Sequence, residues 1–209
     1  MPDTRDSPRT APDADAPPSR RPAHLLVVGA TGALLPAVRA ATALGDTVTA
    51  LARTATALRD LERRTGGRSR PLPRDYRAPG LREDLARASR EIPFTGALLY
   101  CPLATPSTVR ALTAAVPPDR PVVLLLTSAH AAPDSGAADG LPWSPARLPP
   151  AARPTPGCRL LVLGWRTEPD GARWHTPEEI SGAALRVLDA APAGDAVLGC
   201  VRPWSSRPR

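Results

Sequence analysis

The sequence contains no lysine, so all 27 of its basic residues are arginines. A catalytic centre that depends on a lysine amine is therefore excluded. Aromatic residues are also scarce, at 3% of the chain, although apolar residues together make up 42% of it. The hydrophobic core must consequently be built from leucine, valine and alanine rather than from large aromatic rings.

Cysteine is rare as well. Cys101, Cys158 and Cys200 are far apart, and no two of them form a CxxC motif. An odd number of cysteines at such spacings argues against a disulfide framework and against a metal site, so we expect no bound metal. Cys101 and Cys200 lie in apolar, strand-like segments, where a free cysteine usually acts as a small core residue.

Long apolar runs are missing from the chain. No stretch approaches the roughly 20 apolar residues that a membrane-spanning helix needs. The N-terminus also lacks the apolar segment of a secretory signal. We therefore expect a cytoplasmic protein with no membrane partner.

The net charge of +7 raises the question of a nucleic-acid partner. The arginines are nevertheless scattered, with no basic run and no interleaved aromatic residues of the kind that stack on nucleotide bases. We therefore expect no nucleic-acid partner. A solvated surface accounts for most of these arginines, and a site for an anionic small molecule would use a few of them.

Residues 1–22 differ from the rest of the chain in composition. They carry four arginines and four aspartates among prolines and alanines, with almost nothing to bury. Such a segment predicts a disordered tail. Residues 23–209 are sufficient in length and apolar content for one globular domain.

From His24 onward, short apolar runs alternate with segments of helical character. Nearly continuous apolar strands that alternate with helices are typical of a parallel sheet covered on both faces. With right-handed crossovers, the fold class is α/β, a Rossmann-like doubly wound parallel sheet in a three-layer αβα arrangement. The predicted strands span residues 24–28, 47–52, 69–74, 95–101, 121–127, 159–165 and 196–201. The predicted helices span residues 31–44, 54–65, 80–90, 106–116 and 177–190.

The alternation is interrupted by residues 129–158, which are rich in proline, alanine, glycine and aspartate and predict a long loop. Asp170-Gly171 predicts a turn. The sequence from Thr176 to Glu179 predicts a helix start with a capping box, in which Thr176 is the N-cap and Pro177 the first helical residue.

The most informative motif follows the first strand, where a tight glycine turn leads into a helix. This geometry presents backbone N–H groups to a phosphate and points to a dinucleotide. A turn without a ligand is the alternative. The turn is a GxxG variant rather than the full GxGxxG motif, because position 31 is threonine. Leu35 stands where a third glycine often lets the helix pack closely on the strand. The residues assigned to the cofactor are Gly29, Ala30, Thr31, Gly32, Ala33 and Leu34.

The end of the second strand indicates which dinucleotide. It carries Arg53 and Thr54, where an acidic residue would hold the ribose hydroxyls of NAD. A guanidinium matches a 2′-phosphate bidentately, so NADP is favoured as the cofactor. The alternative is that Arg53 is a surface residue at a helix start.

Two further positions are assigned to the cofactor. Asp75 and Tyr76 follow the third strand, where an adenine edge is commonly bound, although Asp75 has the alternative role of capping the next helix. We also assign Cys101, at the end of the fourth strand, to the cofactor site.

From about residue 24 to 203, the chain resembles the short-chain dehydrogenase/reductase superfamily. The glycine turn, the arginine after the second strand and the Asp75-Tyr76 pair look like those of its atypical, NADP-binding members. The resemblance implies a Rossmann fold with a site at the carboxyl ends of the strands. The family's catalytic tyrosine, followed four residues later by a lysine, has no counterpart here. The family also has a serine after the fifth strand, and Ser128 is its counterpart in this chain.

The candidate catalytic residues therefore lie at other strand ends. Tyr100 ends the fourth strand, and Ser128 and His130 follow the fifth, where a histidine can act as an acid or a base. The alternative is that none of them does chemistry, so that Tyr100 is a packing residue, Ser128 a turn residue and His130 a loop residue. We expect an NADP-dependent oxidoreductase acting on a small organic substrate through a non-standard site. Two alternatives to this function are open: a dehydratase, cyclase or isomerase on the same fold, and a non-catalytic NADP-sensing module. Whether the chain forms a homo-oligomer is also open.

Overall fold

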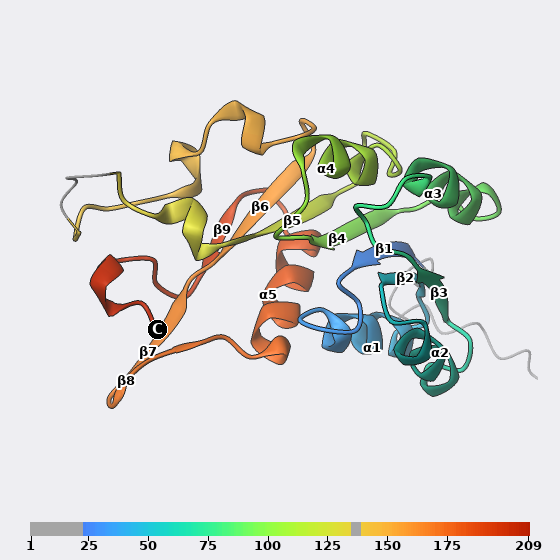
Figure 1. Cartoon of the computed structure of the whole chain (residues 1–209), viewed down its shortest axis with the longest axis horizontal. Helices are drawn as coiled ribbons and strands as arrows, with labels where there is room; N and C mark the ends of the chain where they lie inside the picture. The colour runs from blue at the N-terminus through green and yellow to red at the C-terminus, as the bar shows by residue number, and fades with distance from the viewer. Residues whose placement is uncertain (1–22, 135–138) are drawn as a thin grey trace, which may run out of the picture.

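The computed structural model describes residues 23–134 and 139–209, so the predicted disordered tail at 1–22 lies outside the described residues. Seven parallel strands form one twisted sheet in the order β3-β2-β1-β4-β5-β6-β9 (Figure 1). This order confirms the predicted doubly wound sheet. The strands are β1 (His24–Val28), β2 (Thr47–Ala52), β3 (Ser69–Pro73), β4 (Gly96–Tyr100), β5 (Val122–Thr127), β6 (Cys158–Leu163) and β9 (Ala196–Leu198).

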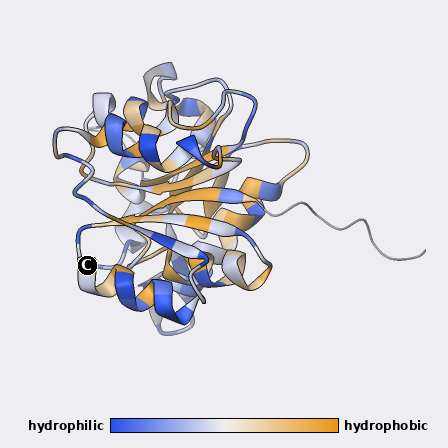
Figure 2. Cartoon of the chain, turned by 90° about the vertical axis from the view of Figure 1, so that its right-hand side faces the viewer, coloured by the Kyte–Doolittle hydropathy of each residue, from blue (hydrophilic) through white to orange (hydrophobic). Residues whose placement is uncertain are grey.

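Helices cover both faces of the sheet, as predicted. One apolar cluster packs α1, α2 and α5 against the first face, and a second packs α3, α4 and parts of the segment after β5 against the other. Figure 2 shows the apolar sheet between helices whose outer sides are hydrophilic. The helices are α1 (Leu35–Ala43), α2 (Ala55–Arg64), α3 (Leu81–Arg90), α4 (Pro106–Thr113) and α5 (Pro177–Asp189).

The alternation of side chains along β1 explains this three-layer arrangement. Leu25 and Val27 belong to the first apolar cluster, whereas Leu26 and Val28 belong to the second, and all four are at most 5% exposed. Successive side chains of a strand point to opposite faces, so an unbroken apolar run requires cover on both sides.

The first helix begins later than the sequence predicts. Residues 31–34 form turns, with the amide of Gly32 donating to the carbonyl of Gly29 at 3.1 Å and the amide of Leu35 to that of Gly32 at 3.0 Å. The helix α1 begins only at Leu35, with Pro36 in its first turn. Proline is favoured there because it lacks an N–H and its φ is already helical.

The prediction of a strand over residues 159–165 is also wrong at its C-terminal end. β6 stops at Leu163, and after Gly164 the chain forms an antiparallel hairpin of β7 (Trp165–Glu168) and β8 (Gly171–Trp174), which was not predicted apart from its turn. The predicted strand 196–201 is shortened likewise. β9 ends at Leu198, Gly199 has a φ of +75°, and Cys200 pairs with Trp165 instead of extending the sheet.

The crossover from β5 to β6 confirms the predicted loop. Its described part contains only 3-10 turns: η1 (Ser128–Ala131), η2 (Pro145–Arg147) and η3 (Pro150–Ala152). A last 3-10 turn, η4 (Trp204–Ser206), lies near the C-terminus. This second face of the sheet is therefore covered by short turns where the other crossovers supply a helix.

The cysteines occupy different environments. Cys101 and Cys158 are buried, whereas Cys200 is exposed, so its prediction as a core residue is wrong because the chain turns out of the sheet at Gly199. Within the described ranges, no group of three or more His, Cys, Asp or Glu side chains gathers as metal ligands would. In the same ranges, no helix combines the length and apolarity that crossing a bilayer requires.

Candidate functional site

A cavity of about 320 Å³ opens at the carboxyl ends of β1, β2, β3 and β4. It lies where the strand order reverses between β1 and β4, the position at which open α/β sheets bind ligands. Its walls come from the loops that follow these four strands. The lining residues are Gly29, Thr31, Gly32, Ala33, Leu51, Ala52, Arg53, Thr54, Arg74, Asp75, Tyr76, Arg77, Tyr100, Pro102 and Leu103.

The glycine turn presents unpaired backbone donors to this cavity. Among the described residues, the amides of Thr31 and Ala33 donate no hydrogen bond, and both residues line the cavity. Buried or partly buried amides normally find a partner, so free amides at a cavity wall indicate a place for an external acceptor. The turn thus has the donors that a phosphate group requires.

Gly29 allows the turn to lie against β4. Its φ is +86°, and a Cβ at this position would lie 3.1 Å from the carbonyl oxygen of Tyr100. Its amide donates to the carbonyl of Leu51 at 3.1 Å, which joins the turn to β2. Only glycine meets both the positive φ and the close backbone approach without strain.

Arg53 and Thr54 follow β2 and line the same cavity. Arg53 is exposed, and its side chain forms neither an ion pair nor a hydrogen bond with any described residue. Thr54 is the N-cap residue of α2, but its side chain makes no capping hydrogen bond. A guanidinium and a hydroxyl are thus available at the wall to bind an anion.

The loop after β3 carries an ion pair between Arg77 and Asp75. Arg77 donates to the Asp75 carboxylate from its backbone amide at 2.9 Å and from its side chain at 3.0 Å. These bonds, with a smaller contribution from the charge of Arg53, lower the pKa of Asp75. The alternative role of Asp75 as a helix cap is wrong, because α3 begins after Gly80.

Tyr100 ends β4 and lines the cavity. Burial, with a smaller contribution from Tyr76, raises the pKa of the Tyr100 phenol above its ordinary value. A raised pKa keeps the hydroxyl protonated at neutral pH, so Tyr100 is a hydrogen-bond donor and not a ready base. This is opposite to the effect that a neighbouring lysine would have on a catalytic tyrosine.

Three residues assigned to the cofactor turn their side chains into the core. Ala30 and Leu34 are 0% exposed and pack with α1, and Cys101 is 6% exposed and packs on the other face. Burial raises the pKa of the Cys101 thiol to about 11, which leaves it protonated and unreactive. None of these three residues is among those that line the cavity.

The structure does not bring the three candidate catalytic residues together in this cavity. Ser128 is 4% exposed in η1, and it does not line the cavity. His130 is exposed and lines a second cavity, with its Nδ1 atom 3.3 Å from the carbonyl of Thr127. Of the three, Tyr100 alone shares the cavity with the glycine turn and Arg53.

Sequence reasoning missed several lining residues. Arg74 and Arg77 flank the Asp75-Tyr76 pair, and Arg74 forms an ion pair with Asp84 of α3. The sequence held a signal for both, because Arg53, Arg74 and Arg77 follow two neighbouring strands. The carboxyl ends of such strands share one edge of a parallel sheet. Pro102 and Leu103 were missed as well, since the apolar segment after β4 carries no distinctive pattern.

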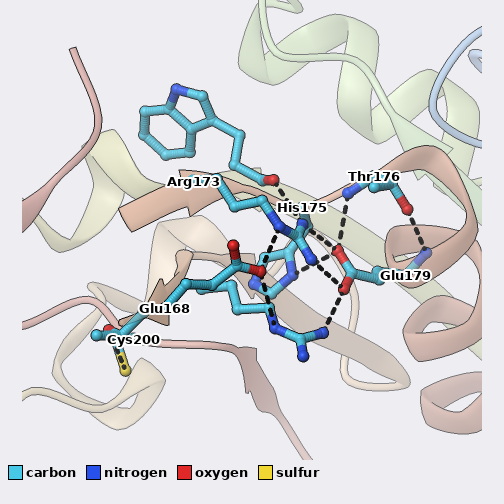
Figure 3. A network of polar contacts seen from close by, with 9 residues as sticks. Glu168, Arg173, His175, Thr176, Glu179 and Cys200 are labelled. Atoms are coloured by element: carbon cyan, nitrogen blue, oxygen red, sulfur yellow. Dashed lines mark hydrogen bonds and ion pairs between the residues drawn. The ribbon is translucent and has the colours of Figure 1, made fainter. Parts of the chain in front are cut away.

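The helix α5 supports the glycine turn from behind. The Ser181 hydroxyl donates to the carbonyl of Ala33 at 2.9 Å, across 148 residues of sequence. The start of α5 is in turn held to the β7–β8 hairpin by the Glu179 carboxylate (Figure 3). Arg173 donates to both oxygens of Glu179, at 2.8 and 2.9 Å, and Arg166 donates at 2.8 Å.

The predicted capping box at this helix start is confirmed. The Glu179 amide donates to the Thr176 hydroxyl at 3.3 Å, and the Thr176 amide donates to the Glu179 carboxylate at 2.9 Å. His175 adds a contact from its Nδ1 atom at 3.3 Å (Figure 3). Glu179 thus links the hairpin, the helix and, through Ser181, the wall of the cavity.

Glu179 is expected to make stability depend on pH. Arg173 first, and then the amide of Thr176, hold the pKa of the Glu179 carboxyl far below its ordinary value. A carboxyl with a lowered folded-state pKa stabilises the protein above its unfolded pKa and loses that contribution as the pH falls. The Tm of the wild-type protein should therefore decline from about pH 5 downward.

The variant Glu179→Gln tests this expectation. It should have a lower Tm than wild type at pH 7 and a smaller decline in Tm between about pH 5 and 3, measured by circular dichroism. Glu178→Gln is the matched control, since Glu178 forms no ion pair within the described residues. Equal acid sensitivity of wild type and Glu179→Gln would contradict the expectation.

Several solved structures share the fold of this chain. A short-chain dehydrogenase from Streptomyces avermitilis is 17% identical, with 87% of this chain and 89% of that chain covered and a TM-score of 0.58. A Brucella melitensis short-chain dehydrogenase/reductase described as a glucose/ribitol dehydrogenase is 13% identical, with 85% and 94% covered and a TM-score of 0.61. A Burkholderia thailandensis oxidoreductase of the same family is 19% identical, with 86% and 91% covered and a TM-score of 0.52.

The chain has the fold of the short-chain dehydrogenases. No protein-family model and no curated protein sequence matches it. The likeness extends over most of this chain and most of each compared structure, so it concerns the whole α/β domain and not a single motif.

Proposed function

We propose that the protein is an NADP-dependent oxidoreductase of the short-chain dehydrogenase/reductase type that acts on a small organic substrate. The observation that carries this proposal is one cavity lined by the amides of Thr31 and Ala33 and by the guanidinium of Arg53, none of which donates a hydrogen bond to any described residue. Phosphate donors at one wall and a cation at another match the two charged parts of NADP.

The residues of the cavity fit this cofactor. The turn at Gly29 would hold the pyrophosphate through its backbone amides. Glycine keeps this turn close to β4, since a Cβ at this position would crowd Tyr100 and the backbone would have to move. Arg53 and Thr54 would hold the 2′-phosphate by charge and by hydrogen bonding. Asp75 and Tyr76, half-buried beside them, would bound the adenine.

NADP(H), when bound, supplies the hydride chemistry, so the protein's part is binding and orientation. Tyr100 is the polar side chain of the cavity at the end of β4, and its protonated hydroxyl would donate to a substrate carbonyl oxygen. Such a donor orients and polarises the carbonyl group without needing to ionise.

Titration with NADPH and NADH, followed by cofactor fluorescence and thermal shift, tests the proposal. Wild type should bind NADPH more tightly than NADH. In Arg53→Ala the affinity for NADPH should fall roughly 10- to 100-fold, the loss of one or two charge-assisted hydrogen bonds, and the affinity for NADH should hardly change. Arg90→Ala is the control, as it removes an exposed arginine of α3 outside the cavity. Absence of binding by either dinucleotide would overturn the proposal.

A second function, NADP sensing without turnover, is favoured by one observation. Ser128 and His130 lie outside the cavity, Tyr100 has a raised pKa, and the Asp75 carboxylate is paired with Arg77. Incubation with NADPH and a panel of small aldehydes and ketones separates the two functions. Carbonyl-dependent loss of absorbance at 340 nm supports the enzyme, whereas tight binding without any oxidation supports the sensor.

A further inference from the structure

A second cavity, of about 340 Å³, lies on the face of the sheet that carries α4 and the β5–β6 crossover. Its floor is formed by Leu124 and Leu126 of β5, and Val109 of α4 forms one side. The turn at residues 152–154 forms the opposite side. Figure 1 shows α4 and the crossover on this face of the sheet.

The cavity exists because the crossover lacks a helix here. Residues 145–147 and 150–152 are single 3-10 turns, which are too short to cover the sheet as an α-helix does. Proline at the start of each turn favours these short structures over a continuous helix. A concave apolar surface is left between α4 and the turns.

The polar side chains that line this cavity are those of Arg110, His130 and Arg153, and no carboxylate lines it among the residues described. The Arg153 guanidinium is already paired with Asp195. Arg110 is exposed at the mouth of the cavity, and its side chain makes no ion pair or hydrogen bond within the described chain, so its guanidinium is available to an anion.

We propose that this cavity binds a small organic monocarboxylate, with its apolar body on Leu124 and Leu126 and its carboxylate on Arg110. An aliphatic chain matches the apolar floor, and a guanidinium binds a carboxylate bidentately. His130 also lines the cavity and supplies a further hydrogen-bonding group. The volume lies at the lower end of the roughly 300–1,000 Å³ found for small-molecule sites, so the ligand is small.

This site is separate from the cavity assigned to NADP. The segment after β4 stands between them, with Pro102 and Leu103 lining the first cavity and Ala104 and Pro106 lining the second. The Ala104 amide donates to the carbonyl of Cys101 at 3.0 Å, which holds this segment in a turn. Binding of the carboxylate is therefore expected with or without a dinucleotide.

Isothermal titration of the full chain with octanoate, without any cofactor, tests the proposal. Octanoate should bind one site per chain, and octanamide, which has nearly the same shape but no charge, should bind at least tenfold more weakly. Arg110→Gln should weaken octanoate binding about tenfold or more, the loss of a charge-assisted bond. Arg82→Gln, the matched loss of an exposed arginine on α3, should leave it unchanged.

A second variant tests the apolar floor. Val109→Trp places a large ring in the cavity from a partly exposed position of α4, and it should abolish binding of octanoate. The proposal is overturned if octanoate does not bind, if octanamide binds equally well, or if Arg110→Gln retains the wild-type affinity. Because no dinucleotide is present, these outcomes are independent of whether the protein binds NADPH.

Discussion

Replacing Gly29 with alanine is expected to weaken NADPH binding at least tenfold and to lower the free energy of unfolding by about 1–2 kcal/mol, the cost of a left-handed conformation for a residue with a Cβ. The loss of affinity has a separate cause. The new Cβ would lie 3.1 Å from the carbonyl oxygen of Tyr100, so the turn must move away from β4. The amides of Thr31 and Ala33 would move with it.

Gly45→Ala provides a matched control for the two effects. Gly45 has a φ of +92°, close to the +86° of Gly29, but nothing lies within 4 Å of its added Cβ. Both variants should therefore lose stability in urea denaturation, Gly29→Ala at least as much as Gly45→Ala, and only Gly29→Ala should lose affinity for NADPH in a fluorescence titration. Equal affinities in the two variants would show that the turn does not hold the cofactor.

Gly164→Ala is expected to cause a larger loss of stability than Gly29→Ala. A Cβ at Gly164 would overlap the backbone carbonyl of Cys200 and would lie 3.0 Å from the carbonyl oxygen of Leu198. These atoms belong to the backbone and cannot rotate away, so β9 would have to separate from β6. Overpacking of this kind costs about 3 kcal/mol or more, which lowers the Tm by roughly 6–12 °C in a chain of this size.

The position also has a matched control. Gly194→Ala adds the same methyl group where nothing lies within 4 Å and no positive φ is required. It should leave the Tm within about 2 °C of wild type, as surface substitutions usually do. A Gly164→Ala protein as stable as Gly194→Ala would contradict the close approach of Gly164 to Cys200.

The doubly wound parallel sheet could be predicted because the signals for its strands are local. The apolar runs of β1, β4 and β5 are unbroken, and such strands require cover on both faces. Right-handed crossovers then leave few topologies. The capping box of Thr176 and Glu179 was predictable for the same reason, since all of its atoms lie within four residues.

Half of the candidate site was predictable on the same basis. The glycine turn, Arg53 and the Asp75-Tyr76 pair each follow a strand, and the carboxyl ends of neighbouring parallel strands share one edge. The contributions of Arg74 and Arg77 follow from the same rule. The positions of Ser128 and His130 do not, because they depend on how the irregular crossover after β5 packs.

By itself, the sequence determined the alternation of strands and helices, the glycine turn and the arginine that follows the second strand. These features depend on periodicity, on the φ that glycine permits and on charge, all of which act over a few residues. The tertiary structure alone decided that the chain leaves the sheet at Gly164 to form a hairpin and that Glu179 holds this hairpin to α5. It also decided that α5 supports the turn through Ser181. These contacts join residues far apart in the chain, and their geometry exists only once the sheet has formed.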